Sequence, residues 1–239
     1  MVNLKEVYDK MKFTEYIKDS FSIEIDKLPL YREAFTHSSY VNEHRNEKLQ
    51  DNERLEFLGD AVLEIAVSNY LFHKYPAYPE GVLTRMRSDI VREESLYMFS
   101  TEIGFDQYVR LGNGEERNGG RNRPSLLADL FEAFLGALYL DLGIDMVGKF
   151  LAQVVFPKID AGVFSHGMDF KTALQEYLQQ GGEIGIDYEL VSEDGPAHNR
   201  QFSVEVSVES IVLGRGSGRT KKEAEQNAAK AALEQVKEP

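Results

Sequence analysis

The stretch "NERLEFLGDAVLEIA", residues 52–66, combines a helical apolar pattern with four acidic side chains. At about 100° per helical residue, these acids fall within an arc of roughly 80° on one side of a predicted helix. Neither lysine nor arginine lies between Glu56 and Asp60 to pair with them at i,i+4 spacing. The stretch therefore predicts either a solvated helix face or a metal or catalytic site. The acids are Glu53, Glu56, Asp60 and Glu64.

A second helical segment, "LLADLFEAFLGALYL" (residues 126–140), carries Asp129 and Glu132 among apolar residues. Its composition predicts burial on nearly every side. Neighbouring buried carboxylates must become protonated or bind a cation. Two helices that each supply a pair of acids offer the hard oxygen ligands that Mg²⁺ prefers. Such sites activate a water nucleophile and neutralise charge on a phosphodiester.

Other chemistries fit these acids less well. Ca²⁺ usually takes its ligands from a loop such as the EF-hand, and the sequence lacks that loop. Zinc would require more of the five histidines near the acids. A glycosidase uses two carboxylates, which leaves a cluster of four unexplained.

Composition sets the broad class. The chain has 239 residues, 42% of them hydrophobic, no cysteine and a net charge of −13. Absence of cysteine excludes a disulfide framework and a thiolate metal site. The N-terminal segment has no hydrophobic signal core, and acids interrupt the most apolar helices well short of the ~20 residues that span a bilayer. We expect a soluble cytoplasmic protein without a membrane partner. The acidic balance disfavours nucleic acid unless basic residues cluster locally.

The chain divides into a helical part and a mixed part. Helix-type periodicity runs through residues 1–158, in segments 4–17, 30–39, 52–73, 80–99, 125–143 and 144–156. Residues 159–168 are predicted to be a linker. Beyond it, a helix at 169–180, strands at 186–193, 200–208 and 210–218, and a helix at 220–236 are predicted. We therefore expect two domains, an all-α domain at 1–158 and a small α+β domain of αβββα order at 169–237.

Basic residues cluster where the last helix begins. Thr220 and Glu223 form a T-x-x-E capping box, which places the two following lysines in the first helical turn. Positive charge there opposes the helix dipole, and a bound phosphate would offset that cost. The pattern fits a solvated helix start, but we favour a phosphate site. The basic residues are Arg215, Arg219, Lys221 and Lys222.

The loop "EDGPAHNR", residues 193–200, is a second candidate for nucleic-acid contact. His198, Asn199 and Arg200 could donate hydrogen bonds to the 2′-hydroxyls and base edges of an RNA minor groove. Alone it is an ordinary polar turn. Together with the lysines and the αβββα order, it predicts a surface that spans one stretch of an A-form duplex.

These motifs resemble the ribonuclease III family over most of the chain, from about Leu4 to Val236. "NERLEFLGD" resembles the family signature, and "LADLFEAFLGALYLD" resembles its second carboxylate helix. "FTHSSYVNE" and "PEGVLTRMRS" match further segments, and the C-terminal part is similar to the double-stranded-RNA-binding domain of the family. The resemblance implies a homodimeric, Mg²⁺-dependent endonuclease, with Mn²⁺ able to substitute. It would cut both strands of duplex RNA to 5′-phosphate and 3′-hydroxyl ends with a short 3′ overhang, in the processing of ribosomal and messenger RNA precursors.

The resemblance also implies roles for individual residues. Phe57 lies beside the acidic arc, where it could be either an aromatic knob that packs into the partner subunit or an ordinary core residue. In the loop "EERNGGRNRPS", Asn118 and Asn122 stand where relatives often have basic residues, which would weaken RNA contacts from this loop. The implied metal ligands are Glu56, Asp60, Asp129 and Glu132, of which Asp60 and Glu132 are catalytic, and Glu53 and Glu80 are outer acids.

Two other functions remain open. One is a non-catalytic double-stranded-RNA-binding protein, although degenerate relatives usually lose the acids that are present here. The other is a phosphohydrolase of small molecules, which would have no use for the C-terminal domain.

Overall fold

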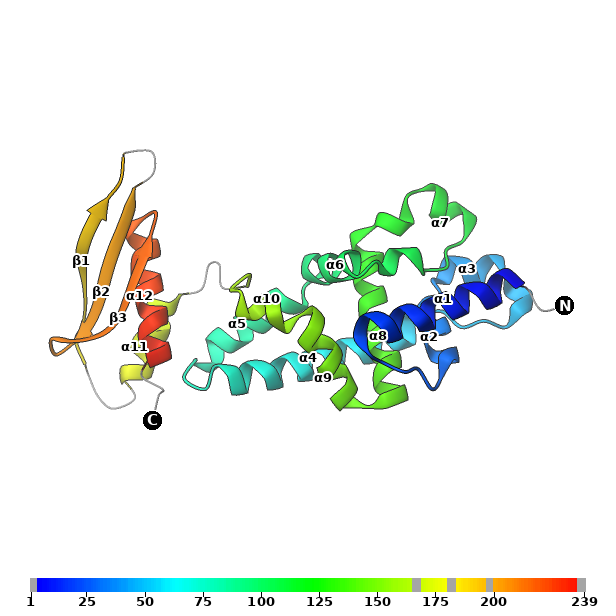
Figure 1. Cartoon of the computed structure of the whole chain (residues 1–239), viewed down its shortest axis with the longest axis horizontal. Coiled ribbons are helices and arrows are strands. Elements are labelled where there is room, and N and C mark those ends of the chain that lie inside the picture. Colours follow the sequence, from blue (N-terminus) through cyan, green and yellow to red (C-terminus); the bar gives the residue numbers. More distant parts are fainter. Residues whose placement is uncertain (1–3, 165–168, 180–183, 197–199, 236–239) are drawn as a thin grey trace. The chain divides into compact units, whose positions relative to one another are not determined.

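The computed structural model describes residues 4–164, 169–179, 184–196 and 200–235 (Figure 1). Its contacts group into two compact units, one formed by residues 1–69 and 88–164 and the other by residues 70–87 and 165–239. In the described part of the chain, we find no helix with the length and apolar character that a membrane span requires.

The N-terminal part is helical, as predicted. Short 3₁₀ turns accompany α-helices, and an isolated bridge between Thr36 and Arg110 is the one β-type pairing among residues 4–164. The α-helices are α1 (Leu4–Phe21), α2 (Leu28–Ala34), α3 (Ser38–Glu43), α4 (Glu53–Lys74), α5 (Glu80–Val91), α6 (Glu93–Glu102), α7 (Asn113–Arg117), α8 (Pro124–Leu142), α9 (Ile144–Val154) and α10 (Phe156–Asp160).

Two of the predicted helices are each broken into two. The predicted helix at 30–39 is interrupted because Thr36 pairs with Arg110, while the His37 side chain caps α3 by accepting from the Ser39 N–H. The predicted helix at 80–99 is interrupted at Arg92, whose backbone is extended. Acids in the first turn of α6 favour a new helix there, because they complement the helix dipole.

The polar loop at 112–124 also contains a helix that the sequence did not predict. The Glu43 carboxylate accepts hydrogen bonds from the backbone N–H groups of Asn113, at 2.9 Å, and Gly114, at 3.4 Å. These bonds satisfy the free donors at the start of α7 and lower the pKa of Glu43. A residue 70 positions away therefore stabilises this short helix.

Helix α8 forms the centre of the first unit. Eleven of its residues are buried, including an unbroken run from Ala133 to Leu138. Its Phe134 ring lies 4.9 Å, centroid to centroid, from both Phe105 and Phe150. Because the apolar residues of α8 contact neighbours on nearly every side, burial of this helix is a main source of the hydrophobic stabilisation of the unit.

Helices α4 and α8 cross at backbone contact. A Cβ atom added at Gly59 of α4 would overlap the carbonyl group of Glu132, and one added at Gly136 of α8 would overlap the carbonyl oxygen of Leu55. Only glycine fits at both positions without moving the helices apart.

The C-terminal part has the predicted αβββα order. It contains α11 (Phe170–Gln179), β1 (Ile186–Asp194), β2 (Gln201–Val208), β3 (Ile211–Gly218) and α12 (Lys221–Gln235). The strands form one antiparallel sheet in the order β1-β2-β3, in which Leu190 pairs with Val204 and Glu205 with Arg215. Both helices cover the same face of this sheet (Figure 1).

Glycines of β3 allow α12 to approach the sheet closely. A Cβ atom at Gly214 or Gly216 would overlap the α12 backbone at Ala228. The facing side of α12 is built from alanines, and Val204 and Val206 of β2 complete the core between them. Small residues on both elements therefore set the spacing between helix and sheet.

The glycine crossing in the first unit makes a direct prediction for stability. Gly59→Ala and Gly136→Ala should each destabilise the protein by about 1–3 kcal/mol, because the added methyl group forces two helix backbones apart. Gly148→Ala is a matched control, since this α9 glycine has open space around its Cβ position. The control should instead gain up to about 1 kcal/mol of helix propensity. Denaturant unfolding measures all three, and equal effects at Gly59 and Gly148 would contradict the close crossing.

Candidate functional site

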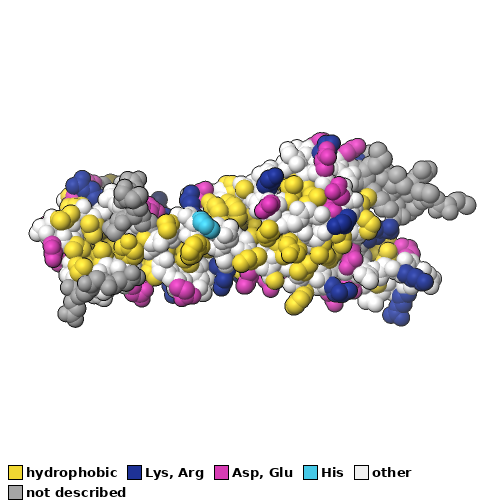
Figure 2. Space-filling model, turned by 90° about the horizontal axis from the view of Figure 1, so that it is seen from below, with side chains coloured by type: hydrophobic (Ala, Val, Ile, Leu, Met, Phe, Trp, Pro, Cys, Tyr) yellow, Lys and Arg dark blue, Asp and Glu magenta, His cyan; other side chains and the backbone are white. Residues whose placement is uncertain are grey.

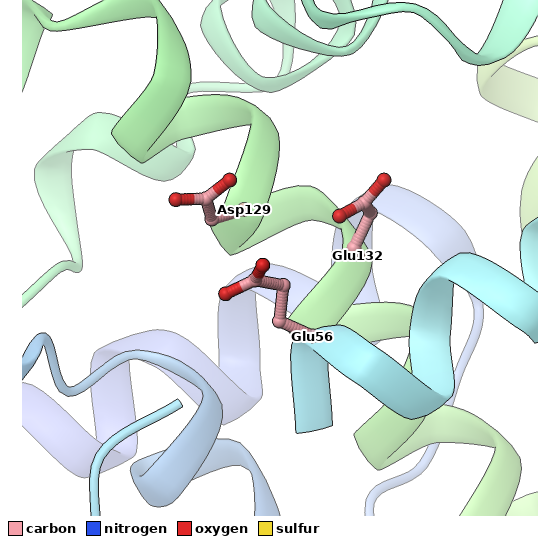
Figure 3. Close-up of side chains that lie close together, drawn as sticks. All are labelled: Glu56, Asp129 and Glu132. Atoms are coloured by element: carbon pink, nitrogen blue, oxygen red, sulfur yellow. The ribbon is translucent and has the colours of Figure 1, made fainter. Parts of the chain in front are cut away.

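Three predicted acids meet where α4 and α8 cross. Glu56 of α4 and Asp129 and Glu132 of α8 each offer a carboxylate oxygen, and these oxygens lie within 4.8 Å of one another (Figure 3). The three side chains are half-buried. Because Gly59 follows Glu56 by one turn and Gly136 follows Glu132 by one turn, the glycine contacts bring the acids together.

The other predicted acids lie outside this group of three. Asp60 is exposed, yet it is near enough for its charge to raise the pKa of both Glu56 and Glu132. Glu53 is also exposed and raises the pKa of Glu56. Glu80 begins α5, where its carboxylate accepts a hydrogen bond from the Thr84 hydroxyl at 2.6 Å. Glu64, the fourth acid of the stretch at 52–66, is exposed as well.

Burial and mutual repulsion disfavour ionisation of the cluster. Burial is the main cause that raises the pKa of Glu132 to about 8, and Asp60, Asp129 and Glu56 add to it. Burial, followed by the charge of Asp129, raises the pKa of Glu56. The pKa of Asp129 is raised by burial and by Glu93. At neutral pH the cluster therefore lacks a positive charge that would balance its carboxylates.

The donor set fits a divalent cation. Its converging atoms are carboxylate oxygens, the ligands that hard cations such as Mg²⁺ and Mn²⁺ take. A cation among them would relieve the repulsion that raises their pKa values. The same arrangement would be costly without a cation, because like charges share a partly buried site.

Two residues that the sequence did not point to also act on this site. Glu93, at the start of α6, raises the pKa of Asp129, and His37, just before α3, lowers it. Helix periodicity gave no signal for either, because both stand at helix starts far from Asp129 in sequence. His37 lies in the segment "FTHSSYVNE", and the resemblance of this segment to the family implied no role for it.

Phe57 is not a core residue of this chain. Its side chain is 81% exposed, the most exposed of the large hydrophobic side chains that the structure describes. On the same helix, Ala61 is exposed and Ile65 is 60% exposed, although Ile65 belongs to the helical apolar pattern of residues 52–66. Hydrophobic side chains also reach the surface in the space-filling view of one molecular face (Figure 2). The structure thus removes the core alternative for Phe57.

Thr220 caps the start of α12 as predicted, while the Glu223 carboxylate bonds one residue before the N-cap, at Arg219. The Thr220 hydroxyl oxygen accepts from the Glu223 N–H at 3.1 Å, and the Glu223 carboxylate accepts from the Arg219 N–H at 2.8 Å. Lys221 and Lys222 therefore occupy the first turn of α12. In the described part of 169–235, Arg219 and these two lysines make no ion pair, so their charges are available to a phosphate.

Other basic residues of this domain are held by acids. Arg200 pairs with Glu193 at 2.6 Å, which leaves the predicted RNA contact of Arg200 in competition with an exposed ion pair. Arg215 pairs with Glu205 at 2.8 Å on the sheet face that the helices do not cover. Arg215 thus lies apart from the basic helix start with which the sequence had grouped it. His198 and Asn199 lie outside the described residues.

A hollow of about 630 Å³ adjoins the basic helix start. Lys222 of α12 lines it together with Thr172 and Gln175 of α11. The Tyr188 hydroxyl of β1, which also lines it, is buried without a hydrogen-bond partner among the described residues. Sequence reasoning missed these α11 residues, because a polar helix face alone does not distinguish a binding surface from a solvated one.

Comparison with known proteins bears on both parts of the chain. Residues 28–159 match the family model described as Ribonuclease-III-like, and residues 170–236 match the Double-stranded RNA binding motif. Ribonuclease 3 of Latilactobacillus sakei is 62% identical over 221 residues, which cover 92% of this chain and 96% of that protein. Ribonuclease 3 of Enterococcus faecalis is 57% identical over 225 residues, which cover 94% and 98%.

A solved structure is similar to the first part of the chain. It is the nuclease domain of ribonuclease III from Campylobacter jejuni, described as flexible in a region involved in dimer formation. The identity is 34% and the TM-score 0.56, with 61% of this chain and 98% of that chain covered.

The raised pKa of Glu132 predicts how stability depends on pH without metal. The folded state keeps a proton on Glu132 up to about pH 8, whereas the unfolded state loses it near 4.5. Stability should therefore fall as pH rises from about 4.5 to about 8 and level off above. In EDTA, Glu132→Gln should show a shallower fall, while Glu56 and Asp129 keep part of it. Melting temperatures from pH 5 to 8.5 measure this, and parallel curves for both proteins would contradict the assignment.

Proposed function

This chain belongs to the ribonuclease III family, and from that premise we propose how its residues cleave double-stranded RNA. The protein is an endoribonuclease that binds double-stranded RNA and acts as a homodimer. The observation that carries the proposal is the convergence of Glu56, Asp129 and Glu132 on one point within the nuclease unit.

The nuclease uses a divalent metal, which we assign as Mg²⁺, with Mn²⁺ as a substitute. Glu56, Asp129 and Glu132 would hold it, joined by Asp60, whose exposed side chain can turn toward the cluster. When bound, the metal lowers the pKa of a water nucleophile and neutralises charge on the phosphodiester. Carboxylate oxygens are the hard ligands that Mg²⁺ prefers.

Among these acids we assign Asp60 and Glu132 to the chemical step. Glu132 carries the highest pKa of the cluster, about 8, so ligation must displace a proton from it near neutral pH. Asp60 is exposed, so water can reach its carboxylate. We place Glu53 and Glu80 as outer acids, and the charge of Glu53 raises the pKa of Glu56.

The RNA-binding surface is centred on the start of α12. Arg219, Lys221 and Lys222 supply charge for backbone phosphates, and the polar residues Thr172 and Gln175 adjoin Lys222 in the hollow. Such contacts recognise the A-form backbone rather than a base sequence. We keep His198, Asn199 and Arg200 as minor-groove contacts. RNA would have to displace Arg200 from Glu193.

Phe57 is our candidate for the dimer interface. An exposed aromatic side chain beside exposed Ala61 and Ile65 offers an apolar surface that a second copy can bury. Because Phe57 follows Glu56 directly, an interface here would place the partner subunit beside the metal centre.

We further propose the chemistry of the product ends, the substrates and the bounds of the two domains. Products would carry 5′-phosphate and 3′-hydroxyl ends, and ribosomal and messenger RNA precursors would be substrates in the cytoplasm, where bacterial transcripts are made. The nuclease domain would end near residue 158, with a linker through 168 and the RNA-binding domain at 169–237. A non-catalytic RNA-binding role is disfavoured, because all four central acids are present.

The central test is Glu132→Gln, which keeps the shape of the side chain and removes its charge. Single-turnover cleavage of long duplex RNA should slow by orders of magnitude. Raising Mg²⁺ should recover part of the rate if Glu132 is chiefly a ligand, and none if its charge is needed for the chemical step itself. Duplex affinity should barely change, and EDTA should likewise abolish cleavage but not binding. Glu64→Gln, an exposed acid of the same helix, is the matched control and should cleave normally. Near-wild-type cleavage by Glu132→Gln at low Mg²⁺ would remove Glu132 from the site.

Replacing both Lys221 and Lys222 with alanine should weaken binding to all duplex sequences alike. The slope of log affinity against log salt should also become shallower by about 1–2, because up to two phosphate contacts are lost. Arg215→Gln is the control, since Glu205 already pairs with this charge on the opposite sheet face. Wild-type affinity of the double variant at physiological salt would overturn the phosphate assignment.

Phe57→Ala tests the interface. Loss of an aromatic anchor worth about 2 kcal/mol should raise the dimer dissociation constant roughly 30-fold. The helical circular dichroism of the monomer should not change, because the side chain is 81% exposed. Ile211→Ala removes an exposed apolar side chain from the other domain and should leave dimerisation unaffected. Sedimentation over a dilution series measures both, and an unchanged constant for Phe57→Ala would place this residue outside the interface.

A further inference from the structure

The sequence contains two asparagine–glycine pairs, Asn113–Gly114 and Asn118–Gly119, and both lie in the polar loop at 112–124. In such a pair the backbone nitrogen of glycine can attack the side-chain amide of asparagine, because glycine has no Cβ to obstruct the approach. The amide is then converted to a carboxylate. All four residues are exposed, so water reaches both pairs. What differs between the pairs is how firmly each is held.

Glu43 holds the first pair in place. Its carboxylate accepts from the Asn113 side-chain amide at 2.7 Å, from the Asn113 backbone N–H at 2.9 Å and from the Gly114 N–H at 3.4 Å. The attacking nitrogen and the leaving group are therefore both bonded to one carboxylate. Its negative charge also disfavours loss of the proton from the Gly114 nitrogen. Both residues lie inside α7, whose helical backbone keeps the peptide group between them from rotating.

The second pair lacks this restraint. Among the residues that the structure describes, none bonds to the side-chain amide of Asn118, which follows the last residue of α7. At a ψ of 11°, the Gly119 nitrogen points away from this amide, so the peptide group has to rotate before attack. One backbone bond opposes the rotation, from the Gly119 N–H to the Glu116 carbonyl at 3.2 Å. Gly119 itself has a φ of 77° and open space where a side chain would stand, so it can follow the rotation.

We propose that Asn118, and not Asn113, is a site of spontaneous deamidation with water as the only co-reactant. The Gly119 nitrogen forms a bond to Asn118 Cγ, and the bond from Cγ to Nδ2 breaks. Ammonia leaves with the proton that the Gly119 nitrogen gives up. Water then opens the resulting succinimide ring at either carbonyl, which yields aspartate or isoaspartate.

The reaction removes the net positive charge of the loop. Residues 112–124 carry three arginines and two glutamates, so one new carboxylate makes the loop neutral. Arg121 and Arg123 are already held in ion pairs with the two glutamates, at 2.6 and 2.5 Å. In the described part of the chain, Arg117 is the arginine of this loop that makes no ion pair. The new carboxylate therefore arises directly beside the arginine whose charge is still uncompensated.

Peptide mapping of the full-length protein over time tests the proposal. Cleavage after glutamate separates the two asparagines into peptides 103–115 and 117–132, and fragment ions distinguish Asn118 from Asn122. In mildly alkaline buffer, Asn118 of the folded protein should deamidate roughly 10-fold or more faster than Asn113, because opening the first pair breaks charge-assisted hydrogen bonds. In urea, which removes the fold, the two rates should become similar.

Glu43→Ala tests the cause of the difference. It removes the three bonds to the first pair, so the rate at Asn113 should approach that at Asn118, which should itself stay unchanged. Asn118→Gln is the control for the site and should eliminate the deamidated form at this position, since the longer side chain closes a ring much more slowly. If Asn118 stayed intact in the folded protein but reacted in urea, the turn would protect it and the proposal would be wrong. Equal rates at the two asparagines of the folded wild-type protein would also overturn it.

Discussion

The backbone contact between α4 and α8 at Gly59 and Gly136 is the constraint on which the rest of the nuclease unit depends. Each glycine stands one turn beyond an acid of the cluster, Glu56 on α4 and Glu132 on α8. The close approach of the two helices therefore also sets the positions of the acids. Side chains larger than hydrogen at the crossing would separate the two helices and the carboxylates with them.

The cluster is electrostatically unfavourable, and its surroundings have to compensate. Burial and like charges raise the pKa of each of the three acids, most of all that of Glu132. The remainder of α8 is apolar and buried, with aromatic contacts around Phe134. Hydrophobic burial along the same helix thus offsets the repulsion at two of its positions. The hydrophobic contacts that stabilise this unit therefore lie next to the carboxylates whose repulsion destabilises it.

Much of this architecture follows from local sequence pattern. Periodicity predicts α4 and α8, alternation predicts β2, and T-x-x-E predicts the start of α12, because each depends on residues a few positions apart. The break at Thr36 and the unpredicted helix α7 depend on Arg110 and Glu43, which are distant in sequence, so no local pattern reveals them. The exposure of Ile65 had the same origin, since a helical projection cannot say which apolar residues find a neighbour.

The residues of the site show the same contrast between local signals and contacts that depend on the fold. Acids were recognisable by type and spacing, whereas the pairing of Arg200 with Glu193 and the position of His37 depend on how the chain folds back on itself.

The uncovered face of the small sheet has a consequence for the first meeting of protein and RNA. It presents Asp187, Glu189 and Glu205, and its Arg215 is already paired with Glu205. A polyanion that drifts toward this face is repelled, whereas one that drifts toward the lysines of α12 is attracted. The acidic sheet face and the basic start of α12 therefore respond in opposite ways to the negative charge of the duplex. The field of the RNA therefore orients the domain before contact. A larger share of random encounters is then productive, most of all at low ionic strength.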